Sequence, residues 1–162
     1  MKKEVLVIRE VREGDLDQAA DLIVRMKRLN GEFDPLFKVV DDVKESALRY
    51  LADSMSTKGD LVLVATEGPK VLGVLRAELK NRLFYQPSSE GRITDFYVLP
   101  EWRRRALGDD MLQRASERLR KMGADMISAD FPARNEIASK FYTKRGFRAL
   151  VDTFAIEDSQ GH

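Results

Sequence analysis

Val98-Leu99-Pro100-Glu101-Trp102-Arg103-Arg104-Arg105-Ala106-Leu107-Gly108 connects a predicted strand to a predicted helix, and the rest of the chain can be interpreted outward from it. The run Ile93-Thr94-Asp95-Phe96-Tyr97-Val98 predicts the strand, and helical periodicity begins near Ala106. The first amide groups of a helix lack intrahelical partners and lie at the positive end of its dipole, so they can bind an anion. Three arginines followed by the small residues Ala106 and Gly108 therefore predict a phosphate-bearing ligand at this turn.

The chain after this turn predicts alternating helices and strands. Apolar residues recur at helical spacing as far as Gly123, a residue suited to a left-handed helix cap. They are Leu107, Met111, Leu112, Ala115, Leu119 and Met122. Residues 124–130 predict a strand, Asn135 predicts the N-cap of a short helix, and residues 147–156 predict a last strand. The strand before the turn, the helix after it and strand 124–130 should form a right-handed parallel unit.

The chain before the turn predicts two helices and three strands. These elements are a strand at 5–11, helices at 15–29 and 42–55, and strands at 61–66 and 71–84. A capping box is expected at each helix start, from Asp15 with Gln18 and from Asp42 with Glu45. The order β-α-α-β-β-β-α-β-α-β has no repeat and no low-complexity linker. It predicts one α/β domain over residues 1–162, with a mixed sheet whose middle strands form an antiparallel hairpin.

Composition excludes several classes of function. The chain has no cysteine, and its one histidine is His162, so we expect no metal site and no Ser-His-Asp triad. The 28 basic residues balance 27 acidic ones, so no overall charge favours nucleic acid or a membrane surface. No apolar run has the length of a membrane span, and no signal-peptide core follows Met1. We expect a cytoplasmic protein.

Two blocks resemble motifs of a known family. Arg103-Arg104-Arg105-Ala106-Leu107-Gly108 resembles the pyrophosphate-binding motif of the GCN5-related N-acetyltransferases (GNAT): Gln or Arg, two residues, Gly, one residue, then Gly or Ala. Asn135-Glu136-Ile137-Ala138-Ser139-Lys140-Phe141-Tyr142-Thr143-Lys144-Arg145-Gly146-Phe147 resembles that family's Asn-x-x-Ala-x-x-Phe/Leu-Tyr-x-x-x-Gly-Phe block. The resemblance implies a single N-acetyltransferase domain. Its central sheet would be mostly antiparallel, with two parallel central strands that splay apart, and helices would flank it.

The resemblance also implies acetyl-coenzyme A as the acetyl donor. Backbone amides of residues 104–109 would bind its pyrophosphate, with Arg103 at the motif's Gln/Arg position. The pantetheine arm would lie where the two parallel strands part, against the backbone of residues 96–98, where the amide near Phe96 can polarise the thioester carbonyl. The expected coenzyme-binding residues are Phe96, Tyr97, Val98, Arg103, Arg104, Arg105, Ala106, Leu107, Gly108, Asp109 and Asn135. Ala106 stands where the family usually has Gly, and we expect it to keep right-handed helical geometry.

The resemblance implies three catalytic candidates. Tyr142 matches the family tyrosine that protonates the departing thiolate, because a phenol with a pKa of about 10 stays protonated at neutral pH. Its alternative role is a core aromatic beside Phe141. Asp130 is the first candidate for the base that deprotonates the amine and Asp95 the second, although Asp130 is equally suited to starting a loop. Asn135 combines the N-cap role with a coenzyme contact that the resemblance implies.

The acceptor is expected to be a primary amine, either a small molecule or part of a peptide or protein. The resemblance assigns its binding to loops 31–40 and 85–91. Acidic and phenylalanine side chains in the first loop favour a cationic amine with an apolar body. Because the chain has no cysteine, direct transfer is favoured over an acetyl-cysteine route. The alternative function is a non-catalytic acyl-coenzyme A sensor, and an open strand edge or apolar face would support a homodimer.

Overall fold

The computed structural model of the chain describes residues 5–158, except for the side chain of Arg104. Within these residues five strands form one sheet: β1 (Leu6–Glu10), β2 (Asp60–Glu67), β3 (Lys70–Asn81), β4 (Ser89–Val98) and β5 (Met126–Ala129). The described α-helices are α1 (Leu16–Asn30), α2 (Val43–Met55), α3 (Leu107–Lys121) and α4 (Glu136–Thr143). A short 3-10 helix, Pro100–Arg105, links β4 to α3.

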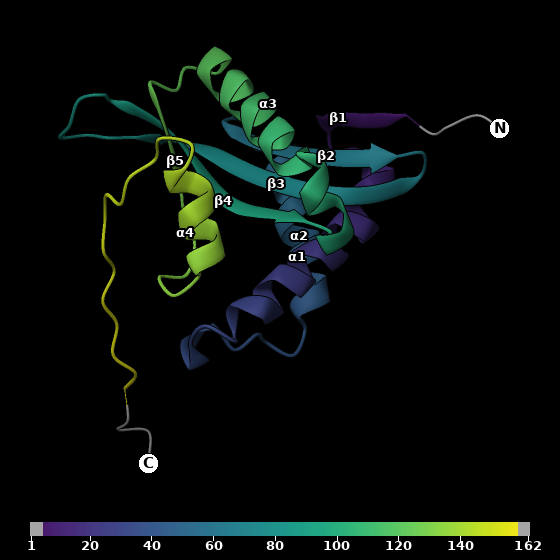
Figure 1. Cartoon of the computed structure of the whole chain (residues 1–162), viewed down its shortest axis with the longest axis horizontal. Coiled ribbons are helices and arrows are strands. Elements are labelled where there is room, and N and C mark those ends of the chain that lie inside the picture. The colour runs from purple at the N-terminus through teal and green to yellow at the C-terminus, as the bar shows by residue number, and fades with distance from the viewer. Residues whose placement is uncertain (1–4, 159–162) are drawn as a thin grey trace.

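The sheet is mixed, which confirms the prediction. Its strands lie in the order β1-β2-β3-β4-β5, antiparallel from β1 to β4 and parallel between β4 and β5. Helices α1 and α2 lie on one face, and α3 and α4 lie on the other (Figure 1). The predicted helix after the arginines is α3, so the phosphate turn joins the end of β4 to one face of the sheet.

The core forms where the apolar stripe of each helix meets the sheet. On α3 the buried residues are Leu107, Met111, Leu112, Ala115 and Leu119, all members of the predicted stripe. The helix lies so close to β3 that a Cβ at Gly73 would come within 2.9 Å of the Met111 sulfur. Glycine at position 73 therefore allows α3, and with it the helix start, to lie close to the sheet.

The two predicted capping boxes are wrong. Neither Asp15 nor Asp42 makes a side-chain cap bond at its helix. Asp15 instead pairs with the Arg9 guanidinium at 2.6 Å. Gln18 accepts a hydrogen bond from the Val71 N–H at 2.9 Å and so holds the start of β3. At α1, partners from the sheet have displaced the local cap, which a short sequence pattern does not reveal.

The predicted last strand is also absent. Residues 148–157 run as an exposed, extended segment without strand pairing, and Figure 1 shows this segment passing clear of the sheet and helices. Phe147 is the last residue before it that is anchored, because its N–H donates to the Tyr142 carbonyl at 3.0 Å. The local pattern of strand-forming residues is present, but the described chain supplies no neighbouring strand.

Residues 5–158 lack two kinds of feature. None of the described helices combines the length and the apolar character needed to cross a lipid bilayer. Within the same residues, no cluster of three His, Asp or Glu side chains could hold a metal ion.

Candidate active site

The parallel strands β4 and β5 pair over four residues and then part. Residues 90–93 of β4 face residues 126–129 of β5, and the final contact is the Asp130 N–H, which donates to the Ile93 carbonyl at 2.9 Å. Beyond Ile93, β4 continues to Val98 with β3 as its described strand neighbour. We call the point after Ile93 the fork. The β5-facing backbone groups of β4 beyond it have no strand partner in the described chain, as the predicted splay requires.

A β-bulge at Thr94 lies directly at the fork. Arg76 on β3 faces Asp95, and the next residue of β3, Ala77, faces Ile93. Thr94 is therefore the extra residue of β4. The Arg76 guanidinium donates to the Thr94 hydroxyl at 3.0 Å and holds the bulge in place. Because a bulge bends its strand and increases the local twist, it supplies a physical reason for β4 to leave β5 here.

Asp95 lies on the side of β4 that faces α1 and α2, and it is 2% exposed. Its carboxylate accepts a hydrogen bond from the Thr94 hydroxyl at 2.8 Å and another from the Tyr50 hydroxyl. The ammonium group of Lys27 lies 2.7 Å from the other carboxylate oxygen. Burial, together with the charge of Asp95, raises the pKa of Tyr50, so this phenol stays protonated and continues to donate. Asp95 therefore ties β4 to both helices.

The backbone at Ala106 is left-handed, with φ 58° and ψ 17°. The expectation of right-handed geometry at this residue is therefore wrong. Ala106 is the one non-glycine residue with positive φ in the described chain. This conformation brings the Cβ of an L-residue against its own backbone and costs roughly 1–2 kcal/mol. The glycine that usually occupies this position in the resembled family would avoid that cost, which explains the family preference.

The start of α3 offers three backbone amides. The first helical hydrogen bond runs from the Asp110 N–H to the Ala106 carbonyl at 3.1 Å, so the amides of residues 107–109 have no acceptor within the helix. A Cβ at Gly108 would lie 3.4 Å from the ring of Phe141, so the helix start is close to α4. Of the amides predicted to bind pyrophosphate, 104–109, those of residues 107–109 are thus free of helical partners in α3.

Two of the three arginines before α3, Arg103 and Arg105, make local contacts in this structure. The Arg103 Nε donates to the Val98 carbonyl at 2.9 Å. The Arg105 guanidinium lies 4.5 Å from the centroid of the Trp102 ring. The side chain of Arg104 lies outside the described part of the chain. Arg103 thus contacts the strand end that the family resemblance assigns to pantetheine. A carbonyl oxygen has two lone pairs, so this contact leaves room for a second donor.

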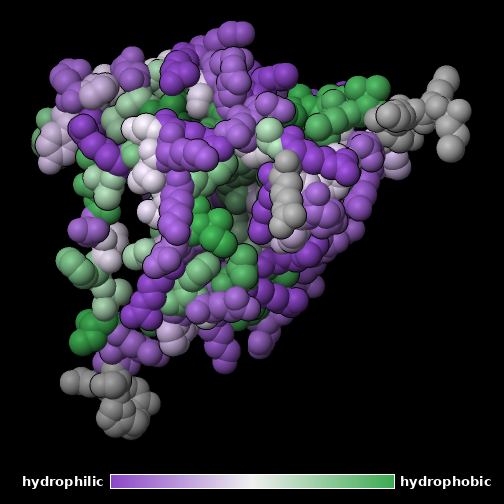
Figure 2. Space-filling model, viewed as in Figure 1, coloured by the Kyte–Doolittle hydropathy of each residue, from purple (hydrophilic) through white to green (hydrophobic). Residues whose placement is uncertain are grey.

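Phe96 and Tyr97 point in different directions from the end of β4. The Phe96 ring meets the Phe141 ring of α4 edge-on at 5.9 Å. Tyr97 is buried, with the guanidinium groups of Arg25 and Arg103 at 5.8 and 5.2 Å from its ring centroid. Figure 2 shows the surface hollowed between α4 and the turn that precedes α3, with hydrophobic residues inside the hollow. The end of β4, α4 and the α3 amides therefore meet around one hollow.

Tyr142 is buried in an aromatic cluster on α4. Its ring stacks on Phe131 at 5.5 Å and meets Phe141 and Phe147 at 5.2 and 5.1 Å. Its hydroxyl has no hydrogen-bond partner among residues 5–158. Burial raises the pKa of Tyr142, so the phenol stays protonated. The ring is thus part of the core, while the hydroxyl remains available as a donor.

Asn135 and Asp130 lie on the loop between β5 and α4. The Asn135 side-chain oxygen accepts from the Ala138 N–H at 3.0 Å, which confirms the predicted N-cap and leaves its NH₂ group for another partner. Asp130 is exposed, and its backbone closes the ladder at the fork. The two candidate bases therefore differ in setting: Asp130 is open to solvent beside the fork, whereas Asp95 is buried and paired.

Arg145 connects the end of α4 to the start of α3. Its guanidinium bonds to the Asp109 carboxylate and donates to the Phe141 carbonyl at 2.7 Å. The same guanidinium lies 3.8 Å from the centroid of the Phe141 ring. Hydrogen bonding to Arg145 lowers the pKa of Asp109. A carboxylate in the first turn of α3 would repel phosphate, so the arginine neutralises an unfavourable charge at this point.

The sequence-based prediction omits Lys27, Tyr50 and Arg145. Two of them carry a signal in retrospect: Lys27 follows Ile23 by four residues on the buried stripe of α1, and Tyr50 follows buried Ala47 by three residues on α2. A polar group placed on a buried stripe indicates a buried partner. Arg145 has no such signal, because basic residues are common near helix ends.

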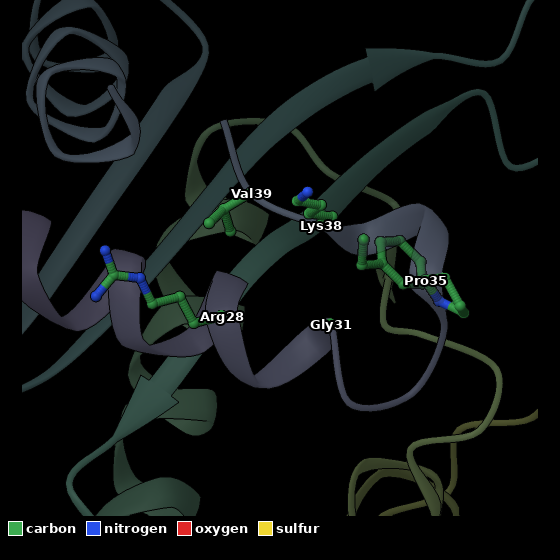
Figure 3. A pocket seen from close by; sticks show the side chains of 6 residues that line it. Arg28, Gly31, Pro35, Lys38 and Val39 are labelled. Carbon is green, nitrogen blue, oxygen red and sulfur yellow. The ribbon is translucent and has the colours of Figure 1, made fainter. Parts of the chain in front are cut away.

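The predicted acceptor loop borders a separate cavity of about 330 Å³. Its lining comes from the end of α1 and the following segment, at Arg28, Gly31, Pro35, Phe37, Lys38 and Val39 (Figure 3). The guanidinium of Arg28 points away from Gly31 and Pro35 in that view. The Asp34 carboxylate accepts a hydrogen bond from the Leu36 N–H at 2.9 Å. The lining therefore combines apolar and basic groups, in contrast to the acidic character predicted for the loop.

Comparison with protein families identifies the domain type. The family described as "Acetyltransferase (GNAT) family" matches residues 26–147, which is most of the chain. This range includes the fork, the α3 amides and α4. Among curated protein sequences no match is found.

Solved structures match the fold over almost the whole chain. The tetramutant of the BH1408 protein from Bacillus halodurans has a TM-score of 0.80 and 19% identity, and covers 93% of this chain and 99% of its own. A predicted acetyltransferase with acetyl-CoA from Clostridium acetobutylicum has a TM-score of 0.75 and 15% identity, covering 94% and 96%. The aminoglycoside antibiotic 6'-N-acetyltransferase AAC(6')-IG from Acinetobacter haemolyticus has a TM-score of 0.74 and 17% identity, covering 94% and 98%. At these identities the likeness concerns the fold.

Proposed function

Because the chain belongs to the GNAT acetyltransferase family, we propose that it transfers an acetyl group directly from acetyl-coenzyme A to a primary amine. Family membership makes it an acyltransferase, with acetyl-coenzyme A as the acetyl donor. The direct route, the amine class and the individual site residues are our proposal. The proposal treats residues 1–162 as one N-acetyltransferase domain.

One observation carries the proposal: the fork opens beside the free amides of α3. The ladder between β4 and β5 ends at Ile93, and the amides of residues 107–109 have no acceptor within their helix. An extended ligand with an anionic end matches both features, because its amide-bearing arm can pair with the unpaired strand backbone and its phosphates with the helix start. Arg103 adds positive charge between the two.

The residues suit acetyl transfer as follows. Bound acetyl-coenzyme A supplies an activated thioester. In the proposed geometry, the Phe96 amide donates to the thioester carbonyl oxygen and stabilises charge that develops there. As the amine nitrogen bonds to the acetyl carbon and the C–S bond breaks, Tyr142 donates its phenolic proton to the departing sulfur. The raised pKa of Tyr142 keeps that proton in place until the thiolate forms.

Asp130 is our candidate for receiving the proton that the amine loses, directly or through water. It is exposed and lies at the fork, so an amine approaching the thioester has access to it. Asp95 is the weaker candidate, because Lys27 and Tyr50 engage both of its carboxylate oxygens and its side chain is fully buried. We assign Asp95 the role of holding the bulge against α1 and α2.

The acceptor class is tested by an activity screen. Purified protein and acetyl-coenzyme A would be incubated with peptide N-termini, lysine peptides, polyamines, small amines and aminoglycosides. The last class is included because fold relatives are named as aminoglycoside acetyltransferases. Release of coenzyme A is followed with a thiol reagent, and the protein adds no background because it has no cysteine. Acceptor-dependent release, with the acetylated amine found by mass spectrometry, supports the proposal. Coenzyme binding without turnover on any acceptor would favour the sensor alternative.

A further inference from the structure

The cavity at the end of α1 combines apolar walls with two positive charges. Its volume is about 330 Å³, and its walls include Pro35, Phe37 and Val39 (Figure 3). The two charges are those of Arg28 and Lys38, and neither side chain has an ion-pair or hydrogen-bond partner among residues 5–158. No carboxylate of the described chain belongs to the lining. A cavity of this composition favours a ligand that joins an apolar body to a negative charge.

Backbone contacts fix the shape of this cavity. Residues Pro35–Phe37 form a 3-10 turn, and the Lys38 N–H donates to the Pro35 carbonyl at 3.2 Å. The segment also folds back closely on the end of α1, because a Cβ at Gly31 would lie 3.4 Å from the Phe37 carbonyl oxygen. The cavity is therefore preformed, which reduces the entropy that a ligand must lose on binding.

Helix α1 connects the cavity to the fork. Lys27, one residue before Arg28, places its ammonium group 2.7 Å from the Asp95 carboxylate. The next residue of β4 is Phe96, whose amide faces the thioester in the proposed geometry. An α-helix rises about 1.5 Å per residue, so Gly31 lies roughly 6 Å beyond Lys27 along α1. With the length of the lysine side chain, the cavity lies roughly 6–10 Å from the fork, the span of about two or three extended amino-acid residues.

We propose that the acetyl acceptor is a primary amine whose apolar body ends in a carboxylate, and that this cavity binds the carboxylate end. The assignment rests on the proposed acetyl transfer and adds the chemistry of the acceptor. With its carboxylate between the two cations and its body against the apolar walls, the acceptor directs its amine toward the fork. There the acetyl carbon passes from sulfur to the amine nitrogen, which loses one proton, and coenzyme A leaves as its thiol.

The charge of the cavity opposes polycationic acceptors. An aminoglycoside carries several amines and no carboxylate, so the two unpaired cations would repel it. The fold relatives that are named as aminoglycoside acetyltransferases therefore do not indicate the acceptor of this chain. A short apolar peptide and an ω-amino alkanoate both have the required chemistry, and the length of either can match the span from the cavity to the fork.

Matched pairs of acceptors test the proposal. Trileucine is compared with trileucine amide, and ω-aminooctanoate with ω-aminooctanamide, so that each pair shares its amine and its body and differs in the carboxylate. Steady-state kinetics with acetyl-coenzyme A should give a kcat/KM at least about 10-fold higher for the carboxylate member, through a lower KM, because charge-assisted hydrogen bonds hold it. The larger of the two ratios distinguishes a peptide from an amino alkanoate.

Variants of the two cations assign the effect to the cavity. Arg28→Ala and Lys38→Ala should each reduce the ratio within a pair by about 5-fold. Arg28→Glu should reverse the preference, a result that general damage to the fold would not produce. Arg120→Ala is the control, because it removes an exposed charge of the same sign from α3, on the other face of the sheet, and should keep the wild-type ratio.

Binding of a product separates this inference from the proposed function. N-acetyl-trileucine keeps the carboxylate but has no amine to acetylate, so calorimetry measures its binding whether or not the protein transfers acetyl groups. Equal kcat/KM within both pairs, or faster acetylation of kanamycin than of trileucine, would overturn the inference and leave acetyl transfer in place. If no amine is acetylated while N-acetyl-trileucine binds the wild type and not Arg28→Ala, acetyl transfer is overturned and the carboxylate site stands.

Discussion

Ala106 has a left-handed backbone conformation, with φ 58°, that is strained for an L-residue. The strand before this turn and the helix after it could be predicted from sequence, because each has a clear pattern of apolar residues. The handedness of residue 106 could not, because alanine favours right-handed geometry and nothing local indicates otherwise. Here the geometry of the turn has overridden the preference of the residue.

Ala106→Gly should therefore stabilise the protein. Removing the left-handed strain should raise the free energy of unfolding by roughly 1–2 kcal/mol. The greater conformational freedom of glycine in the unfolded chain should lower it by about 0.4–1 kcal/mol. The net expectation is a rise of about 0.5–1 kcal/mol in the free energy of unfolding, measured by urea denaturation. Ala52→Gly, on the exposed side of α2, is the control and should lose about 1 kcal/mol. A loss of stability at position 106 as well would show that the turn is not strained.

Tyr142→Phe separates a catalytic hydroxyl from a core ring. The ring contacts are kept, so affinity for acetyl-coenzyme A and thermal stability should change little. If the hydroxyl protonates the leaving thiolate, kcat should fall about 100-fold, within the usual range for general acid catalysis. Steady-state kinetics and calorimetry with the coenzyme measure the two effects separately. An unchanged kcat would assign Tyr142 to the core alone.

Two helices, α3 and α4, border the proposed coenzyme site, and Arg145 connects them. Without its guanidinium, the Asp109 carboxylate at the start of α3 would be left unpaired beside the phosphates. Arg145→Ala should weaken acetyl-coenzyme A binding about 10-fold, equivalent to about 1.4 kcal/mol. Asp109→Asn in the same chain should restore most of the affinity. Arg134→Ala, a change of an exposed arginine on the loop before α4, is the control. Equal losses at 145 and 134 would show that overall charge, and not this pair, controls binding.

The elements themselves were largely predictable, with one informative exception. Periodicity located α3 and its buried residues, and the parallel pairing of β4 with β5 followed from the strand, helix and strand order. The parting of β4 from β5 was expected from family resemblance, whereas the bulge at Thr94 could not be located from the local sequence, because it depends on the register with β3. Residues 147–156 have strand-forming composition but no partner within the described chain. Pairing is a tertiary property, so composition alone overestimated the sheet.

For the molecule as a whole, the free energy of unfolding should depend on pH. Burial raises the pKa of Tyr142, and burial with the charge of Asp95 raises that of Tyr50. A group whose pKa is raised on folding stabilises the native state fully below its unfolded pKa, about 10, and less as the pH rises above it. Each tyrosine should therefore remove about 1.4 kcal/mol per pH unit above that point.

Urea denaturation between about pH 9 and pH 12 measures this slope against the unfolded tyrosine pKa of about 10. Tyr50→Phe and Tyr142→Phe should each flatten it, and the double variant should flatten it most. The difference between variant and wild type removes the contribution of the lysines, which titrate in the same range. A slope that is the same in all four proteins would show that neither phenol changes its pKa on folding.

The central claim is that the fork and the start of α3 form one acetyl-coenzyme A site. Hydrogen exchange followed by mass spectrometry, with and without acetyl-coenzyme A, tests it most directly. We predict slower exchange in two separate segments, residues 95–98 of β4 and residues 106–110, because the β5-facing amides of the first segment and the amides of residues 107–109 acquire acceptors. Protection confined to the cavity at Arg28 and Lys38, or no protection by the coenzyme anywhere, would contradict the claim.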